Sequence, residues 1–271
     1  YLGGLLYHGI PKFRLDKELV SKVIKQILDL GIEVKTNVSL GKDISLKKLE
    51  KEYDAVFLGL GANVSKMMGI SGEELNGVYG ANELLENLVR VDYTAKRVVV
   101  IGGGGVSIDI ARTAIKEGAS EVGIIYRRGR NEMSAEMDDI KSAKKEGINF
   151  LFQTNVIKIL GKDKVGGIEC IKTTLDKDKK AINVVGSNFV IDTDVVIMAV
   201  GSRADSELLE SLKLDVKDNG YLMVNGDNQT SNQKIFAAGD LTGAKSTVAW
   251  ACRNGRDTAY SIMKFLSKGG E

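Results

Sequence analysis

The chain of 271 residues is poor in the residues on which several classes of site depend. It contains two cysteines, one histidine and one proline. Cys170 and Cys252 are far apart, which excludes a disulfide framework, a Cys-x-x-Cys redox pair and a zinc site built on such a pair. We expect both cysteines to be small buried apolar groups in a reducing cytoplasm. We expect His8 to be a packing or surface residue and not a proton donor.

The sequence also lacks blocks of one charge and long apolar runs. Its 38 basic and 36 acidic residues leave a net charge of +2, so nothing points to nucleic acid or an anionic membrane as a partner. No stretch is apolar enough to span a membrane, and glycines, His8 and Lys12 interrupt the opening residues 1–14, unlike a signal peptide. With 43% hydrophobic residues the chain can bury one large core or two modest ones.

Two passages share the same order of features, which predicts a duplicated domain. The first is LGIEVKTNV at 30–38, followed by YDAVFLGLGA at 53–62. The second is EGINFLFQTNV at 146–156, followed by TDVVIMAVGS at 193–202. In each, a helix ends at Gly-Ile, a short strand leads to Thr-Asn-Val, and a later buried strand ends at a glycine.

The second passage is preceded by a glycine loop that the first passage lacks. This loop begins at Gly102, ahead of Gly147, and the same offset counted back from Gly31 falls before Tyr1. Because the sequence also begins without Met, we expect it to be an N-terminally truncated form of a longer protein. A divergent first copy without any loop is the alternative.

The loop itself is KRVVVIGGGGVSIDIART at 96–113, which predicts a buried parallel strand, a tight turn and a helix. It fits the dinucleotide fingerprint G-x-G-x-x-G/A, with Ser107 as a small departure at the third position. Gly102 makes the turn, and Gly104 lets a pyrophosphate approach the N–H groups at the helix start. The residues expected to bind the cofactor here are Gly102, Gly104, Gly105, Val106 and Ser107.

The helix after the loop is predicted to lay Val106, Ile110 and Ala114 on the sheet, because these apolar residues recur every four positions. A second strand is predicted at 122–126. It ends in YRRGR instead of the acidic residue that binds a ribose 2′-hydroxyl. Arginine suits a 2′-phosphate, so Arg127 and Arg128 favour NADPH over NADH, with a solvated basic turn as the alternative.

Near the end, IFAAGDLTGAKSTVAWACRNGRDTAYSI at 235–262 predicts a strand ending at Gly239-Asp240 and a helix over about 247–265. Together with GGLLYHGIPKFRL at 3–15 and YRRGRNEMSA at 126–135, the chain resembles the flavoprotein of the glutamate synthase small-chain family over essentially its whole length. This resemblance implies an α/β fold of two nested Rossmann-like, three-layer nucleotide-binding domains, as in disulfide-reductase-like flavoproteins. A split FAD-binding domain would comprise residues 1–93 and 205–271, and an NAD(P)H-binding domain would be inserted at 94–204.

The resemblance further implies that electrons pass between NADPH and FAD toward an iron–sulfur or partner-subunit acceptor. The partner would be a large catalytic subunit or a ferredoxin-like electron carrier. Beside the flavin and its diphosphate it places Gly4, Leu5, Gly9 and Ile10. At the ends of the crossing strands of the two domains it places Gly61 and Gly201.

Four more residues are assigned to the flavin by the same resemblance. The Asp240 carboxylate would accept a hydrogen bond from the ribityl chain, with Gly239 allowing close approach. The N–H groups near Thr247 and Val248 would face the pyrimidine edge of the flavin, where a helix N-terminus stabilises negative charge.

The chain also departs from the family. It has neither the first glycine loop nor the N-terminal cysteines that hold iron–sulfur clusters, so we expect FAD to bind weakly or to be lost while NADPH still binds. Ser134 stands where the family usually has Pro. No acid, base or nucleophile constellation stands out, and hydride transfer between cofactors needs none.

Two alternatives are left open by the sequence. One is a nucleotide-binding fragment without turnover. The other is a short-chain-type dehydrogenase, because Tyr260 and Lys264 are one helical turn apart, although such pairs are common on any helix.

Overall fold

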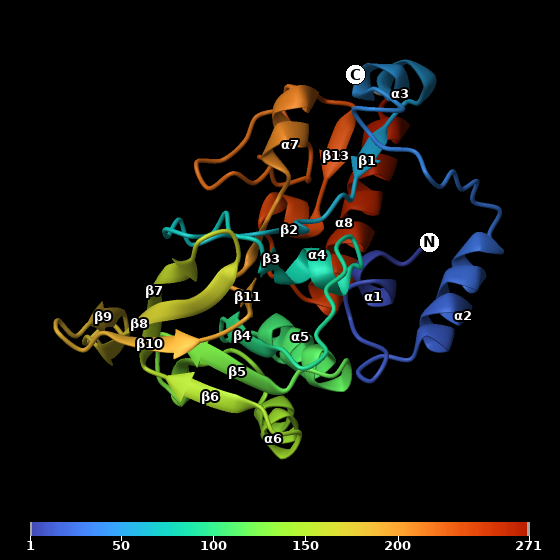
Figure 1. Cartoon of the computed structure of the whole chain (residues 1–271). Helices are drawn as coiled ribbons and strands as arrows, with labels where there is room; N and C mark the ends of the chain where they lie inside the picture. Colours follow the sequence, from blue (N-terminus) through green and yellow to red (C-terminus); the bar gives the residue numbers. More distant parts are fainter. Residues whose placement is uncertain (1, 270–271) are drawn as a thin grey trace. The chain divides into compact units, whose positions relative to one another are not determined.

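The computed structural model describes residues 2–269, which form two compact units. The first unit comprises Tyr1–Ile32 and Ser65–Ser202, and the second comprises Glu33–Val64 and Arg203–Glu271. Figure 1 shows the chain coloured along its sequence. The chain passes between the units at three points, and the short strands β2 (Val64–Ser65) and β12 (Ser202–Arg203) span two of them.

A five-stranded parallel sheet forms the centre of the first unit. Its strand order is β3-β11-β4-β5-β6, with every neighbouring pair parallel. The bounds of these strands are β3 Val78–Gly80, β11 Val195–Met198, β4 Arg97–Ile101, β5 Glu121–Tyr126 and β6 Asn149–Phe152. The predicted strands at 98–101 and 122–126 are therefore confirmed as β4 and β5.

Both faces of this sheet are covered, which explains why β4 is an unbroken apolar run. Val98 and Val100 pack into one core with the helices, while Val99 and Ile101 pack into another with an antiparallel sheet. The helices are α4 (Ala81–Leu85), α5 (Gly105–Lys116) and α6 (Met137–Lys145). Successive side chains of β4 thus pack against opposite layers, as expected for a buried parallel strand.

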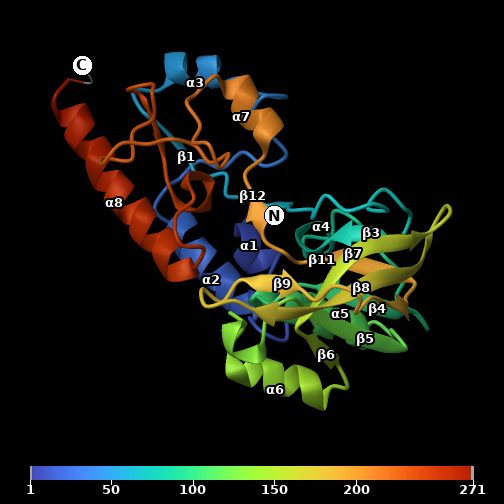
Figure 2. The same ribbon diagram turned by 90° about the vertical axis from the view of Figure 1, so that its left-hand side faces the viewer.

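The antiparallel layer is a long hairpin with two added strands (Figure 2). Its order is β10-β8-β7, and β9 also pairs with β8. The bounds are β7 Thr154–Gly161, β8 Val165–Leu175, β9 Ala181–Asn183 and β10 Phe189–Asp192. Cys170 of β8 is buried in this layer as expected, and burial raises the pKa of its thiol to about 12.

The first unit also contains the short helix α1 (Gly4–Tyr7), α2 (Lys17–Leu28) and a 3-10 turn, η1 (Arg130–Glu132). The expected inserted domain began at residue 94, whereas residues 65–93 cluster with the first unit. The physical reason is β3, which pairs with β11 and extends the same sheet. At the other boundary, the unit ends at Ser202, two residues from the expected 204.

The second unit packs helices on a short parallel pair of strands. β1 (Val56–Leu58) pairs with β13 (Ile235–Ala237). Around them lie α3 (Leu46–Glu52), α7 (Ser206–Leu212), η2 (Gly239–Thr242) and α8 (Val248–Ser267). Helix α8 confirms the expected terminal helix, but Cys252 on it is exposed, so the expectation that both cysteines are buried was wrong.

The duplicated passages differ in the structure. Residues 149–152 of the second copy form β6, but residues 32–38 of the first copy form no strand and are exposed. The strand expected there was wrong, because an isolated extended segment without a paired neighbour leaves its backbone groups to water. The structure holds no helix, within residues 2–269, that is long and apolar enough to cross a membrane.

An ion pair at the base of β4 gives the first unit a defined acid sensitivity. Asp194 accepts hydrogen bonds from the Arg97 backbone N–H at 2.9 Å and from its guanidinium at 3.0 and 3.1 Å. These bonds lower the pKa of the Asp194 carboxyl to about 2. Because the folded pKa lies below the unfolded value, this stabilisation is complete above the unfolded pKa and is lost as the pH falls through the folded pKa.

We therefore expect Asp194→Asn to lower the free energy of unfolding by about 1 kcal/mol at neutral pH, a figure that allows for the partial exposure of the pair. The difference from the parent protein should shrink between about pH 4 and pH 2. Thermal unfolding of both proteins across that range measures it. A difference that is constant with pH would contradict the role of this carboxylate.

Candidate dinucleotide-binding site

The glycine loop lies at the carboxyl end of β4, where backbones approach too closely for a side chain. Gly102 has φ +150°, and a Cβ on it would lie 2.2 Å from the carbonyl oxygen of Ala199. Its own N–H donates to the Ile125 carbonyl at 3.0 Å. The strands on both sides of β4 therefore hold Gly102 in place, and the predicted need for glycine at this turn has a steric cause.

Gly103 is a residue whose role the sequence analysis missed. A Cβ here would lie 2.4 Å from the ring of Tyr126, so the loop packs directly on that ring. Its carbonyl oxygen accepts hydrogen bonds from Ala135 N at 3.1 Å and Ser134 Oγ at 3.3 Å. Ser134, at the position where the family usually has Pro, therefore forms a hydrogen bond to the glycine loop. The segment 126–135 is bound to the loop in this way.

The helix that follows begins at Gly105 with no side-chain cap. Its first N–H groups are thus available to an anion, as at other dinucleotide sites. Ser107 is fully buried, and its hydroxyl donates to the Gly104 carbonyl at 2.6 Å. It packs the helix against the sheet and does not line the pocket described below.

Val106 is exposed by 40%, so its expected burial on the sheet was wrong. The first turn of α5 extends beyond the carboxyl edge of the sheet, and Val106 lines the pocket there. Ile110 and Ala114, one and two turns later, are buried as expected.

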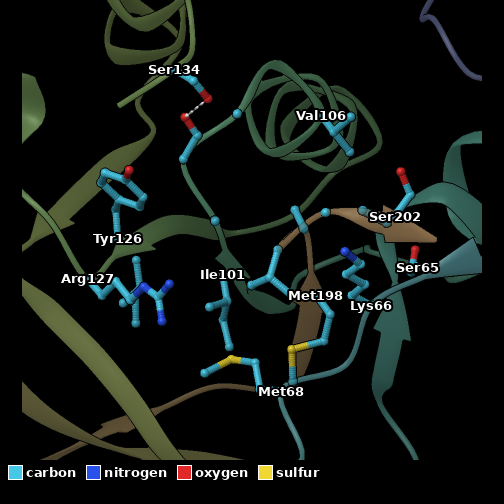
Figure 3. A pocket seen from close by; sticks show the side chains of 18 of the residues that line it. Ser65, Lys66, Met68, Ile101, Val106, Tyr126, Arg127, Ser134, Met198 and Ser202 are labelled. Carbon is cyan, nitrogen blue, oxygen red and sulfur yellow. Dashed lines mark hydrogen bonds between the residues drawn. The ribbon is translucent and has the colours of Figure 1, made fainter. Parts of the chain in front are cut away.

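A pocket of about 530 Å³ opens at the carboxyl ends of β4, β5 and β11, entirely within the first unit (Figure 3). Strand β4 is flanked by β5 on one side and β11 on the other, which is the switch point at which open α/β sheets bind ligands. The predicted site residues that line it are Gly102, Gly104, Gly105, Val106, Arg127, Arg128 and Gly201. Lining residues not predicted include Ser65, Lys66, Met68, Asn82, Tyr126 and Asn155.

The charge of the pocket lining is of one sign. Its charged residues are Lys66, Arg127 and Arg128, and no Asp or Glu among residues 2–269 lines it. The Arg128 guanidinium lies over the Tyr126 ring, 5.4 Å from its centroid, and its buried Nε has no hydrogen-bond partner in the described part of the chain. Arg127 is exposed, while its carbonyl accepts from Thr173 Oγ1 at 2.6 Å. A guanidinium can bind a phosphate through two parallel hydrogen bonds.

The predicted flavin-side residues divide between the two units. In the first unit, Gly9 N and Ile10 N both donate to the Leu5 carbonyl, which folds residues 4–10 into a compact turn. Lys17 Nζ donates to the Leu6 and Ile10 carbonyls.

The segment after this turn is tied to two helices of the first unit. Arg14 Nε lies 2.7 Å from Asp109 Oδ1 of α5, and another guanidinium nitrogen of Arg14 lies 2.6 Å from Asp139 Oδ2 of α6. The segment that precedes α2 is thus attached to the helix of the glycine loop.

In the second unit, Gly61 and Gly239 adopt left-handed φ values of +75° and +72°. Asp240 is half-buried in η2, and the exposed Thr247 caps α8 by accepting from Trp250 N at 3.3 Å. Val248 is also exposed at the start of α8.

The short-chain dehydrogenase alternative gains no support from the structure. Tyr260 is 64% exposed on α8, and Lys264 lies 3.9 Å from Asp227. Both belong to the second unit, whereas the glycine loop belongs to the first. Within residues 2–269, no group of three or more His, Cys, Asp or Glu side chains could hold a metal ion.

Comparison with known proteins identifies the family of this chain. Residues 3–259 match the model of the family described as pyridine nucleotide-disulphide oxidoreductase. The small chain of glutamate synthase [NADPH] from Escherichia coli K12 is 35% identical over 98% of this chain, which covers 61% of that relative. A putative glutamate synthase [NADPH] small chain from Cereibacter sphaeroides is 31% identical over 98% of this chain, which covers 69% of it.

A further relative is the beta subunit of NADP(+)-dependent formate dehydrogenase from Moorella thermoacetica, 33% identical over 98% of this chain and 39% of its own length. The chain thus spans about 60% or less of several curated relatives.

Among solved structures, FprA from Mycobacterium tuberculosis in complex with NADPH has a TM-score of 0.80 and 19% identity, covering 98% of this chain and 75% of FprA. Thioredoxin reductase from Lactococcus lactis has a TM-score of 0.71 and 20% identity, covering 98% and 88%. These two show the fold, which is the α/β, disulfide-reductase-like flavoprotein fold expected from the sequence. The chain belongs to the pyridine nucleotide-disulphide oxidoreductase family, among the members that are similar to the glutamate synthase small chain.

Proposed function

We propose that this chain binds NADPH in the pocket of the first unit and passes electrons between NADPH and FAD. The observation that carries the proposal is the pocket at the end of β4, where a glycine loop, an uncapped helix start and two arginines meet without an acidic residue. An anionic dinucleotide with a third phosphate matches this lining in charge and in the order of its groups.

The residues of this chain fit a flavin on weaker but independent grounds. Gly61 and Gly239 leave backbone bare of side chains where strands end, Asp240 offers a half-buried carboxylate, and α8 begins at the exposed residues Thr247 and Val248. When bound, the two cofactors would supply the hydride chemistry themselves. The protein would contribute binding, orientation and the exclusion of competing reactions.

The acceptor of the electrons is proposed from the relatives. Curated relatives are named as a glutamate synthase small chain and as beta subunits of NADP(+)-dependent formate dehydrogenase and NADPH-Fe(3+) oxidoreductase. We propose that this chain likewise serves a partner, either a large catalytic subunit or a ferredoxin-like iron–sulfur carrier.

A titration with FAD and NADPH tests the proposal. Purified protein is supplemented with FAD, freed of excess cofactor and mixed with NADPH without oxygen. We expect a retained flavin spectrum that bleaches on NADPH addition. In Asp240→Ala the flavin should be lost, while NADPH affinity changes less than about twofold, since Asp240 does not line the NADPH pocket. Protein that binds both cofactors without bleaching would contradict the proposed electron transfer.

A colourless protein that binds NADPH normally would support the second candidate, a nucleotide-binding chain without turnover. The feature of the structure that favours this candidate is that the glycine-loop pocket lies complete within the first unit.

A further inference from the structure

Lys66 is the third cation of the pocket, and it lies across the glycine loop from the two arginines. Its backbone N–H donates to the Gly201 carbonyl at 2.9 Å, which fixes Lys66 beside the end of β11. Figure 3 shows Arg127 and Lys66 on opposite sides of Ile101, the last residue of β4. Since β5 and β11 pair with the two edges of β4, the glycine loop lies between the charges.

A dinucleotide bound over this loop must place its two halves on the two sides of β4. The arginines at the end of β5 suit a phosphate on the adenosine ribose, and the start of α5 suits the diphosphate. The remaining half then extends toward the end of β11. The pocket wall there includes the apolar side chains of Met68 and Met198, and Lys66 is the charged lining residue on that side.

We infer that Lys66 faces the nicotinamide half and makes the pocket discriminate against the oxidised cofactor. This inference rests on the proposed function and adds a specificity residue to it. The nicotinamide ring carries a positive charge in NADP⁺ and none in NADPH. A nearby ammonium therefore repels only the oxidised form. Lys66 thereby favours binding of NADPH and release of NADP⁺, so that product leaves when its ring has given up the hydride.

The experiment compares three ligands on the whole chain and on Lys66→Met. Calorimetry gives Kd for NADPH, for NADP⁺ and for adenosine 2′,5′-bisphosphate, which lacks the nicotinamide half. The ratio of the NADP⁺ Kd to the NADPH Kd should fall by about tenfold in Lys66→Met, as expected for loss of one close like-charge contact. Affinity for adenosine 2′,5′-bisphosphate should stay within about twofold, and Lys66→Arg should retain the parent ratio. Lys66 is exposed, so the variant keeps the fold.

Two results would overturn the inference. One is an unchanged ratio in Lys66→Met. The other is a loss of affinity for adenosine 2′,5′-bisphosphate well beyond the expected twofold, because that places Lys66 at the adenosine half. Failure of the proposed function is recognised separately, since the parent protein would then bind neither NADPH nor the bisphosphate.

Discussion

Gly102→Ala should lower the affinity for NADPH by about 100-fold or more, and should also lower the free energy of unfolding by about 3 kcal/mol. The new Cβ would lie 2.2 Å from the Ala199 carbonyl oxygen at a left-handed φ of +150°. The neighbouring backbone cannot yield, because Ala199 N donates to the Ile101 carbonyl at 2.8 Å. The loop must therefore move, and the N–H groups at the start of α5 then no longer point toward the diphosphate.

Gly123→Ala is the matched control for this prediction. Gly123 lies in β5 of the same sheet, and a Cβ there would meet nothing within 4 Å at an ordinary φ. We expect unchanged NADPH affinity and equal or higher stability, because alanine is better suited than glycine to a strand. Thermal unfolding and calorimetric titration compare the variants. A Gly102→Ala protein that binds NADPH like the parent would remove the glycine loop from the site.

The local parts of this site could be predicted because short-range physics fixes them. Four apolar residues followed by four glycines specify a buried strand and a turn wherever they lie, and β4 and α5 formed there. Helix α8 was predictable for the same reason, since Thr247 caps its first turn. Arg127 and Arg128 follow β5 directly, so their place on the pocket follows from that strand alone.

The remaining parts depend on contacts between distant segments, for which a single sequence carries no signal. Lys66 precedes the glycine loop by more than thirty positions in an irregular segment, and its backbone N–H bonds to the distant Gly201 carbonyl beside the pocket. The packing of Gly103 on Tyr126 is of the same kind. The three-residue strand β3, which draws residues 65–93 into the first unit, is too short to show a hydrophobic period.

Replacing Arg127 and Arg128 with Ala should weaken NADPH by about 100-fold while changing NADH by no more than about threefold. Each arginine can contribute about 1.5 to 3 kcal/mol through charge-assisted hydrogen bonds to a phosphate. NADH lacks the 2′-phosphate, so removal of the two arginines should change its affinity little. Arg128 already stacks on Tyr126, which orients its guanidinium before a ligand arrives. Its Nε has no hydrogen-bond partner within the described residues.

Arg130→Ala separates this local effect from a general loss of positive charge. Arg130 is an exposed arginine of the same loop that does not line the pocket, and its guanidinium lies 3.2 Å from Met137 Sδ. Its removal should change NADPH affinity by less than about twofold, because an exposed charge outside the pocket is screened by salt. Kd values for NADPH and NADH on all variants decide the matter. Equal weakening of both dinucleotides in the double variant would mean that the arginines form only a solvated basic turn, and would withdraw the assignment to NADPH.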